Sequence, residues 1–537
     1  MAVHHRKQLL VNIVDGLAKV KPLGVYAYIP ISPDGYDKGW TKLTYQKYAN
    51  AVNGLAWWLT AQFGKNSSFE TLTYVGPNDF RHNALILACQ KVGYKLLLAS
   101  HRNQHEALRA LLDQASCKAI LTADPASAMT TRYQEAFPLS AFQVPSLDVL
   151  LSESFPHYPF RKTFEEAKLD PLVVLHTSGT TGLPKPIIYS NDWVAAYMQS
   201  MQVLPPGGKE MKTKHWSGTR FFVIMPPHHA ANLFTAFFIP FANETTIIFP
   251  PANLPPTMDV FIKGIKSIQV DSAFIPPSLI SQLALDEDLL EIAARHLDVV
   301  YTGGGKSVEA HGDIVSSRLN YQITYGATET GNIPDILTDA PNSWNYIQPH
   351  SAAGWEFRLH EQTESQSVYE AWIVRSKDSE MEQPVFKLFP HLREYSTRDL
   401  YSAHPTEPGL WKWVSRIDDT IVLSSGANLS PVIMENGLEQ HPSVLSVVMA
   451  GCGQLRPVLI LERRDPIISA QQLIEEVWST VEELNQHYYE DHRVLKSHII
   501  VTTQERPMAR TMKGTIQRHA TVDLYEADLE DLFMKAT

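Results

Sequence analysis

Apolar residues in the first part of the chain follow two spacings. In residues 45–62 they recur every three or four positions, which predicts a helix with one apolar face. Residues 71–75 are a short apolar run that ends at Gly76, and such a run predicts a buried strand. Short apolar strands between helices predict a mostly parallel sheet covered on both faces. The other elements predicted in this part are a helix at 80–92 and strands at 95–99 and 118–122.

The middle of the chain, about residues 170–410, continues this alternation, with a turn-rich connector predicted at 247–256. The last part changes character. Ser469 and Gln472 have the spacing of a capping box, and a helical apolar stripe follows them. This part predicts a small α+β unit of about a hundred residues that begins near residues 416–420. Its predicted strands are 443–450, 457–461 and 498–501.

Composition places the chain among ordinary globular proteins. It has 537 residues, 44% hydrophobic and 19% charged, enough apolar material for several cores. The net charge of -11 and the lack of a long basic run argue against nucleic acid as a partner. No stretch is apolar enough to span a bilayer, and the polar start of the chain argues against a signal peptide. We therefore expect a cytoplasmic protein without a membrane partner.

The most informative segment is 172–189, LVVLHTSGTTGLPKPIIY, where apolar runs flank a loop of glycine and hydroxyl residues. Glycines let backbone amides approach an anion closely, hydroxyls add donors, and Lys185 adds positive charge. Lys185 does not directly follow a glycine, so this is not a Walker loop. Pro186 and the apolar run after it predict a strand, and hence a hairpin that closes over a triphosphate. The residues predicted to hold phosphate are Thr177, Ser178, Gly179, Thr180, Thr181, Gly182 and Lys185.

A surface turn between two strands is the competing interpretation of this loop. The ordered string argues against it, because it resembles the phosphate loop of the adenylating (ANL) superfamily of acyl-CoA synthetases, firefly luciferase and non-ribosomal peptide synthetase adenylation domains. The resemblance covers almost the whole chain. It implies an α/β fold with a large multi-sheet N-terminal adenylation domain and a small, mobile α+β C-terminal domain. The boundaries it implies are 1–415 for the large domain, 416–419 for the hinge, 420–522 for the small domain and 523–537 for a linker-like tail toward a carrier domain.

Residues 325–330, YGATET, resemble the second signature of this superfamily. The resemblance implies that Glu329 holds Mg²⁺, a hard cation that prefers carboxylate and phosphate oxygens. It implies that Thr328 binds the α-phosphate of ATP. Tyr325, followed by Gly326, would pack on the adenine.

Two further strings resemble the superfamily motifs. Residues 397–399 resemble Thr-Gly-Asp with arginine in the glycine position, and Asp399 would accept both ribose hydroxyls. Residues 416–419 resemble the hinge motif, in which Arg416 would contact ribose or phosphate and Asp418 would be the pivot. Gly426 follows at a spacing typical of the family, where the backbone would approach the incoming thiol arm.

The final motif departs from the family pattern. The family has a catalytic lysine directly after a glycine, but here Thr515 follows Gly514 and Lys513 precedes it. In the catalytic role, Lys513 would stabilise charge on the carboxylate oxygens and the α-phosphate during adenylation. Alternatively, Lys513 is a solvated surface lysine and the catalytic charge is weaker or comes from elsewhere.

The acyl pocket is indicated by residues 225–230, MPPHHA, in which His229 takes the position of the family's gating residue. Relatives that activate amino acids carry an aspartate a few residues later, and 231–235 contain none. Because an unpaired ammonium in a closed pocket is costly, we expect a small carboxylic acid without a free α-amine, with an aryl acid favoured. The other candidate pocket residues, which could equally be plain core, are Phe234, Phe274, Tyr301, Gly303 and Gly304.

Within the superfamily the chain resembles the fungal NRPS-like carboxylic acid reductases, in residues 184–187, in 513–518 and in the tail from Leu524. Their domain order is adenylation, carrier, reductase. The implied activity is ATP-dependent conversion of the acid to an acyl-adenylate plus pyrophosphate, then transfer to the phosphopantetheine thiol of a carrier domain, with a reductase domain downstream. The alternatives are a freestanding acyl-CoA ligase and a non-catalytic module that binds acid or nucleotide.

Overall fold

The structure is a computed structural model that describes residues 7–100, 103, 105–178, 184–305, 307–338, 340, 342–362, 367–419, 421–424, 428–429, 431–488, 490–511 and 514–536. The chain forms two compact units. The first comprises Met1–Gly304, Val315–Trp355 and Ile373–Tyr395. The second comprises Gly305–Ile314, Glu356–Trp372 and Ser396–Thr537. The predicted domain boundaries at 415, 419 and 522 stay predictions.

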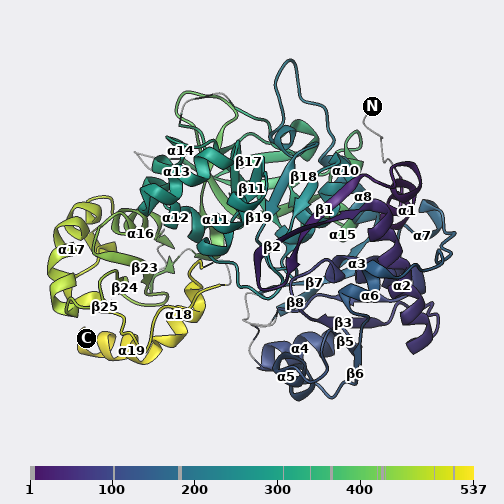
Figure 1. The fold of residues 1–537 in the computed structure, drawn as a ribbon. Coiled ribbons are helices and arrows are strands. Elements are labelled where there is room, and N and C mark those ends of the chain that lie inside the picture. The colour runs from purple at the N-terminus through teal and green to yellow at the C-terminus, as the bar shows by residue number, and fades with distance from the viewer. Residues whose placement is uncertain are drawn as a thin grey trace. The chain divides into compact units, whose positions relative to one another are not determined.

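The first unit contains a six-stranded sheet in the order β6-β5-β3-β4-β7-β8 (Figure 1). Its strands are β3 Thr71–Val75, β4 Lys95–Leu97, β5 Cys117–Thr122, β6 Ala141–Gln143, β7 Pro171–Ser178 and β8 Pro184–Ser190. Neighbours pair in parallel except β7 and β8, which form an antiparallel hairpin. All five residues of β3 are buried, as in a strand covered on both faces. The predicted mostly parallel sheet is therefore confirmed.

A seven-stranded sheet of the same unit has the order β13-β12-β11-β9-β10-β1-β2. Its strands are β1 Val25–Ser32, β2 Gly35–Thr44, β9 Arg220–Val223, β10 Thr246–Ile248, β11 Ser272–Phe274, β12 Val299–Gly303 and β13 Tyr321–Thr324. Only β2 runs antiparallel to its neighbour. The carboxyl ends of β9, β11, β12 and β13 therefore meet at one edge, where ligands bind in open α/β sheets. The connector predicted at 247–256 is wrong at its start, because Ile247 and Ile248 belong to β10.

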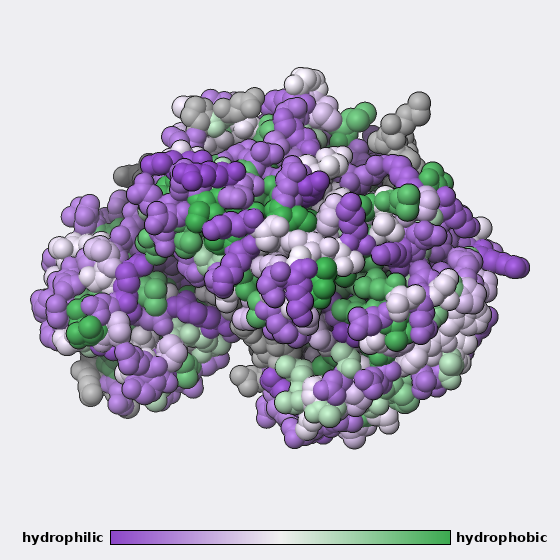
Figure 2. Space-filling view, viewed as in Figure 1, coloured by the Kyte–Doolittle hydropathy of each residue, from purple (hydrophilic) through white to green (hydrophobic). Residues whose placement is uncertain are grey.

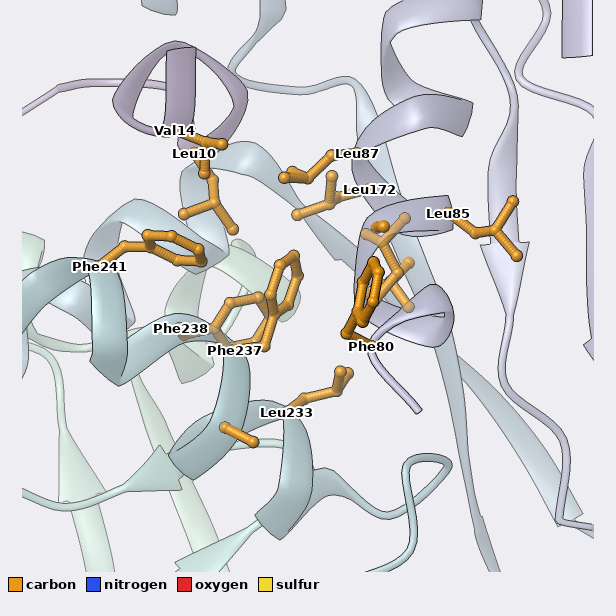
Figure 3. Close-up of a cluster of buried hydrophobic side chains, with 14 of the residues drawn as sticks. Leu10, Val14, Phe80, Leu85, Leu87, Leu172, Leu233, Phe237, Phe238 and Phe241 are labelled. Atoms are coloured by element: carbon orange, nitrogen blue, oxygen red, sulfur yellow. The ribbon is translucent and has the colours of Figure 1, made fainter. Parts of the chain in front are cut away.

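The helices of the first unit bury their apolar faces against these sheets. α2 Tyr45–Phe63 and α3 Arg81–Val92 confirm the two predicted helices. Figure 3 shows part of the largest core cluster, in which residues of α1, α3, β7 and the helical segment 233–243 lie together. The other helices are α1 Leu10–Val20, α4 His105–Gln114, α5 Ala128–Ala136, α6 Leu147–Ser152, α7 Phe164–Ala167, α8 Asn191–Ser200, α9 Ala230–Asn232, the π-helix Leu233–Phe238, α10 Ile239–Asn243, α11 Met258–Ser267, α12 Pro277–Leu285, α13 Glu287–His296 and α15 Val385–Leu388.

In the second unit, β20 Trp411–Arg416, β19 Glu394–Ala403, β18 Ser367–Val374 and β17 Trp355–Gln362 lie side by side in that order. A separate sheet has the order β23-β24-β25 and carries α17 Ala470–Asn485 (Figure 1). Its strands, β23 Val444–Ala450, β24 Val458–Arg463 and β25 Ile499–Val501, confirm the predicted C-terminal elements. The shorter elements are η5 Ile417–Asp419, β21 Ile421–Val422, β22 Asn428–Leu429, α16 Val432–Glu439, α18 Arg518–Leu524 and α19 Glu526–Ala536; α14 Glu309–Ser316 begins in this unit.

The capping box predicted at the start of α17 is half formed. Ser469 accepts a hydrogen bond from the Gln472 amide nitrogen at 3.1 Å. The reciprocal bond is absent in this described segment, because the Gln472 side chain donates to Glu476 at 2.9 Å instead. One side-chain cap is therefore sufficient at this helix end.

Within the described part of the chain, none of the helices combines the length and apolar character that crossing a bilayer requires. On the face drawn in Figure 2, hydrophilic side chains cover most of the surface.

Candidate active site

The hairpin predicted around the phosphate loop is present. Thr177 pairs with Lys185 and Ser178 with Pro184, so β7 and β8 bracket the loop. The Lys185 side chain is exposed, as a phosphate ligand must be before binding. The carboxyl end of β7 is fixed by His176, whose Nε2 accepts a hydrogen bond from the Ser100 amide at 3.1 Å. Gly179, Thr180, Thr181 and Gly182, with the side chain of Ser178, lie outside the described residues, so their phosphate-binding role stays a prediction.

The second signature forms a tight turn. β14 Gly326–Ala327 pairs antiparallel with β15 Gly331–Asn332, so residues 328–330 connect the two strands. The Thr330 hydroxyl accepts from the Ala327 amide at 3.3 Å and donates to the Gly331 carbonyl at 2.9 Å. Gly331 has φ +70°, and a Cβ there would lie 2.5 Å from the Tyr197 ring. Glycine is therefore required where the turn packs against α8.

Two aromatic side chains hold this turn against the phosphate hairpin. Tyr189 of β8 donates its hydroxyl to the Thr328 carbonyl at 2.5 Å. Trp193 of α8 donates its Nε1 to the Glu329 carbonyl at 3.2 Å. Both side chains are fully buried, and their rings stack in parallel with centroids 3.8 Å apart. The strand that leaves the phosphate loop and the helix that follows it thus hold the backbone of Thr328 and of Glu329, respectively.

Sequence reasoning missed Tyr189 and Trp193. The signal available was an aromatic residue at every fourth position after the loop, at 189, 193 and 197. Such a stripe predicts only a packed helix face, so the hydrogen-bond partners of the Tyr189 hydroxyl and the Trp193 indole N–H could not be predicted from it.

Glu329 is half-buried on the turn that Trp193 fixes. No group of three or more His, Cys, Asp or Glu that could cage a metal occurs among the described residues. A glutamate carboxylate in this position fits Mg²⁺, which commonly takes one or two protein carboxylates and completes its shell with phosphate oxygens and water.

A buried ion pair connects the segments that precede and follow the signature turn in the sequence. Lys212 Nζ lies 2.7 Å from Asp335 Oδ2, with both side chains almost completely buried. Lys212 also donates to the carbonyls of Ile323, just before the signature, and Tyr346, both at 3.1 Å. Burial raises the pKa of Asp335, whereas Lys212 and the Gln348 amide lower it. This pair, which the sequence analysis did not identify, fastens β13 to the segment after the turn.

The predicted pocket residues follow the carboxyl ends of neighbouring strands. Phe274 ends β11 beside Tyr301 of β12, and Gly303 ends β12 beside Thr324. A Cβ on Gly303 would lie 2.5 Å from the Thr324 carbonyl, so glycine permits this close approach. Gly304, with φ +70°, turns the chain away from the strand.

The aromatic candidates are buried. Phe234, Phe274 and Tyr301 belong to one hydrophobic cluster, and the Tyr301 hydroxyl donates to the Lys212 carbonyl at 2.9 Å. Tyr325 lies edge-on to Trp355, with ring centroids 5.0 Å apart. Pocket lining and adenine packing stay predicted roles for these residues.

His229 caps the short helix α9. Its Nδ1 accepts a hydrogen bond from the Ala231 amide at 3.1 Å, so in the neutral ring the proton is on Nε2. In this tautomer Nε2 of His229 is the hydrogen-bond donor of the ring, and it is the nitrogen that does not bond the helix end.

In the second unit, β19 and β20 bring Asp399 and Arg416 opposite each other as backbone partners. Asp399 is 7% exposed, and its Oδ1 accepts a hydrogen bond from Trp413 Nε1 at 2.9 Å. The Asp399 amide donates to the Thr397 hydroxyl at 3.2 Å. Asp399 and Arg416 are predicted from their sequence motifs, whereas Trp413 lies outside those motifs.

Asp418 lies in the short turn η5 that follows β20. Its Oδ1 is 2.5 Å from Arg398 Nη2, and its Oδ2 is 3.4 Å from Arg416 Nη2. Asp418 therefore lies between two arginine side chains of the β19–β20 hairpin.

The segment around the predicted catalytic lysine is held by local hydrogen bonds. The Gly514 amide donates to the Thr511 carbonyl at 3.0 Å, and the Thr511 amide donates to the Thr515 carbonyl at 2.7 Å. The hydroxyls of Thr511 and Thr515 are 2.6 Å apart. Thr515, in the family's lysine position, is thus bonded within this segment. Lys513, like Gly426, lies outside the described residues.

Comparison with known proteins gives two family matches. The model of the AMP-binding enzyme family matches residues 24–359, and that of the AMP-binding enzyme C-terminal domain matches residues 418–537.

Among curated relatives, the carboxylic acid reductase of Neurospora crassa is 30% identical over 99% of this chain and 51% of its own length. The isocyanide synthase-NRPS hybrid crmA of Aspergillus fumigatus is 29% identical over 99% of this chain and 34% of its own. The adenylate-forming reductase Nps9 of Serpula lacrymans is 25% identical over 81% of this chain and 41% of its own. The chain spans about half the length of these relatives or less.

Solved structures share the fold at low identity. ATP-bound MatB from Rhodopseudomonas palustris has a TM-score of 0.71 at 16% identity, covering 98% of this chain and 100% of that one. The anthranilate CoA ligase AuaEII with anthranoyl-AMP also has a TM-score of 0.71 at 16% identity, covering 97% and 98%. The predicted ANL fold, with a large and a smaller domain, is therefore confirmed.

Proposed function

The chain belongs to the family of AMP-binding enzymes, and on that basis we propose that it activates a small carboxylic acid as an acyl-adenylate and passes the acyl group to a phosphopantetheine thiol. The family is adenylate-forming and uses ATP. The identity of the acid and of the thiol acceptor is the proposed part.

One observation carries the proposal: Tyr189 of β8, the strand that leaves the phosphate loop, bonds the Thr328 carbonyl, and Trp193 of α8, the helix that follows this strand, bonds the Glu329 carbonyl. The two segments that would bind the phosphates and the metal are thereby held side by side. Phosphoryl chemistry of this kind depends mainly on positioning and charge neutralisation, so a rigid connection between these segments is what the reaction requires.

In the proposed reaction a carboxylate oxygen attacks the α-phosphorus of ATP in line. The bond from this phosphorus to the oxygen that bridges it to the β-phosphate breaks, and pyrophosphate leaves. The loop donors and Lys185 would hold the departing phosphates, and Thr328 would hold the α-phosphate. Mg²⁺ on Glu329 would neutralise phosphate charge when bound.

For the second unit we propose four roles. Asp399 accepts the ribose hydroxyls, since an ionised carboxylate offers two acceptor oxygens. Arg416 contacts ribose or phosphate, and Asp418 serves as the hinge. Lys513 supplies positive charge during adenylation, as its position beside Gly514 suggests.

In the second half-reaction the thiol sulfur attacks the acyl carbon and its proton passes to water. The bond between the acyl carbon and the phosphate oxygen breaks, and AMP leaves with that oxygen. The backbone near Gly426 would approach the phosphopantetheine arm. The relatives named as reductases support a carrier domain and a reductase domain as the partners in this step.

For the substrate we propose an aryl acid without an α-amine. No acidic residue follows His229 within 230–235 to pair with an ammonium group. The neighbourhood of the signature turn is rich in buried aromatic rings, with Phe234 at 5.0 Å from Tyr197 between centroids. His229, Phe274, Tyr301, Gly303 and Gly304 would complete the pocket.

Pyrophosphate exchange with a panel of aryl, aliphatic and amino acids tests the adenylation step. We expect ATP-dependent exchange with aryl acids, weak exchange with amino acids, and AMP rather than ADP as the nucleotide product. ATP binding without exchange for any acid would contradict the proposal and indicate a non-catalytic module. Acyl transfer to a carrier protein, compared with free coenzyme A, separates an adenylation domain from a freestanding ligase.

A further inference from the structure

Arg398 adopts a backbone conformation that suits glycine. Its φ is +59°, in the left-handed region where an L side chain crowds the backbone. The superfamily motif has glycine at this position, and arginine replaces it in this chain. A residue that carries this steric cost in a functional segment is expected to provide a compensating contact.

That contact is with the turn after β20. The Arg398 guanidinium lies 2.5 Å from Asp418 Oδ1, and Arg416 approaches the other oxygen of the same carboxylate at 3.4 Å. A further hydrogen bond, from the Arg398 amide to the Ser396 hydroxyl at 3.1 Å, fixes the backbone itself. The left-handed backbone at 398 thus directs a long cationic side chain toward Asp418.

The next residue, Asp419, is held by a different arginine. Arg518 lies 3.3 Å from Asp419, donates to both oxygens of Glu435 at 2.7 Å, and donates to the Met449 carbonyl at 2.8 Å. These contacts tie Asp419 to the α16 and β23 elements of the C-terminal sheet. Its neighbour Asp418 is tied instead to the β19–β20 hairpin.

The two attachments differ in burial. In the Arg398–Asp418 pair the side chains are 52% and 19% exposed, and in the Arg518–Asp419 pair they are 17% and 29% exposed. Arg518 is held in addition by Glu435, whose side chain is 11% exposed. Solvent-exposed ion pairs are weak and screened by salt, and breaking a buried pair leaves an uncompensated charge. The Asp418 attachment is therefore the one that can open while Asp419 stays bound to the C-terminal elements.

We propose that Arg398 is a positioning residue that acts through Asp418. The Arg398–Asp418 ion pair, which we call the latch, must break before the backbone dihedral angles of the hinge turn can change between the two half-reactions. The inference rests on the proposed function, in which Asp418 is the hinge. The latch sets the ratio of acyl transfer to adenylation, and the buried Arg518 cluster keeps Asp419 fixed throughout.

The test compares Arg398→Gly with a matched control. Glycine suits φ +59°, so this variant removes the latch without straining the backbone. The control is Glu244→Gly, which has φ +55° and loses a similarly exposed ion pair, with Lys21 at 2.7 Å. Each variant is assayed for pyrophosphate exchange, for acyl transfer to a phosphopantetheinylated carrier protein, and for amide hydrogen exchange in peptides covering residues 417–424.

For Arg398→Gly we expect pyrophosphate exchange to change less than twofold. The ratio of acyl transfer to exchange and the hydrogen exchange of the hinge peptide rise about two- to fivefold, the range of an exposed ion pair. The wild type and Glu244→Gly both keep the Arg398–Asp418 pair, so in 1 M salt both move toward the behaviour of Arg398→Gly, whereas Arg398→Gly itself shows no such salt response. An unchanged ratio and unchanged hinge exchange, with adenylation intact, would overturn the latch. Loss of adenylation in the wild type would overturn the proposed function, and the hydrogen-exchange comparison would still decide the latch.

Discussion

The indole of Trp413 holds the Asp399 carboxylate in one orientation, which the proposed acceptance of two ribose hydroxyls would require. The bond joins Trp413 Nε1 to Asp399 Oδ1 at 2.9 Å, on a carboxylate that is 7% exposed. A hydrogen bond to a charged group contributes about 1.5–3 kcal/mol. The orientation of Asp399 therefore depends on a residue outside its own motif.

Replacing Trp413 by phenylalanine removes this bond and keeps most of the ring. We expect the KM for ATP in pyrophosphate exchange to rise about tenfold, the lower end of that range, because a rotated carboxylate meets the ribose poorly. Trp411→Phe is the control, since Trp411 stacks on Phe357 at 3.8 Å and has no such bond to Asp399. An equal effect of both substitutions would indicate general damage to the sheet rather than a role for Trp413.

Lys513 differs from Thr515 in what its side chain can supply. The Thr515 hydroxyl lies 2.6 Å from that of Thr511, and a neutral hydroxyl cannot provide the positive charge that the family's lysine provides. For Lys513→Ala we expect adenylation to fall by about 10²–10³-fold, the usual loss for one group that stabilises developing charge, with little change in the thermal midpoint. Lys496→Ala, which removes a surface ion pair with Glu475, serves as the control. Adenylation that survives in Lys513→Ala would place the catalytic charge elsewhere.

At the scale of elements, β8 and α8 act as the support of the signature turn. Tyr189→Phe removes the hydrogen bond to the Thr328 carbonyl and leaves the stacked ring in place. We expect a loss of about 1–3 kcal/mol in the free energy of unfolding, because the carbonyl loses a buried donor. We also expect the Mg²⁺ and ATP concentrations for half-maximal exchange to rise severalfold. Tyr94→Phe, which removes a hydroxyl bond to the Phe63 carbonyl, should lower stability similarly without changing either concentration.

Elements with a clear period were predictable from the sequence, whereas those defined by their neighbours were not. The helix at 45–62 and the strand at 71–75 carry their own pattern and appear as α2 and β3. β10 has three residues, and it is a strand only because β1 and β9 pair with it on both sides. Chain-local patterns contain no information about such partners.

The same distinction applies to the site. The predicted phosphate hairpin, the signature turn, Asp399 and Asp418 lie in contiguous motifs, so residue order alone is enough to nominate them as site candidates. The contacts that hold them are long-range: Tyr189 and Thr328 are 139 positions apart, and Lys212 and Ile323 are 111 apart. These pairs follow from the packing of the whole unit, which no single segment of the sequence specifies.

For the whole molecule, the two units carry different parts of the proposed reaction. The phosphate hairpin and the signature turn belong to the first unit, whereas Asp399, Arg416 and Asp418 belong to the second. The ion pairs of Arg398 and Arg518 involve Asp418 and Asp419, two adjacent residues of the proposed hinge, within the second unit. If the reaction proceeds in two half-reactions with a conformational change between them, the exposed Arg398–Asp418 pair would break and the Arg518–Asp419 pair would stay formed.

Acid should weaken the first unit, because two of its histidines are held neutral by burial. Burial lowers the pKa of His82 and of His176 to about 4, from 6.5 in the unfolded chain. Between pH 6.5 and 4 the unfolded state therefore binds more protons than the folded state, so the free energy of unfolding falls as the pH falls. A shift of this size corresponds to about 3 kcal/mol of folding free energy for each histidine, fully lost only below pH 4.

Urea unfolding from pH 7.5 to 4, with hydrogen exchange in α3 and β7 as the local probe, should show this decrease in the free energy of unfolding. His82→Gln/His176→Gln should flatten it, whereas His487→Gln at an exposed position should not. A slope that persists unchanged in the double variant would assign the acid sensitivity to other groups, such as buried carboxylates.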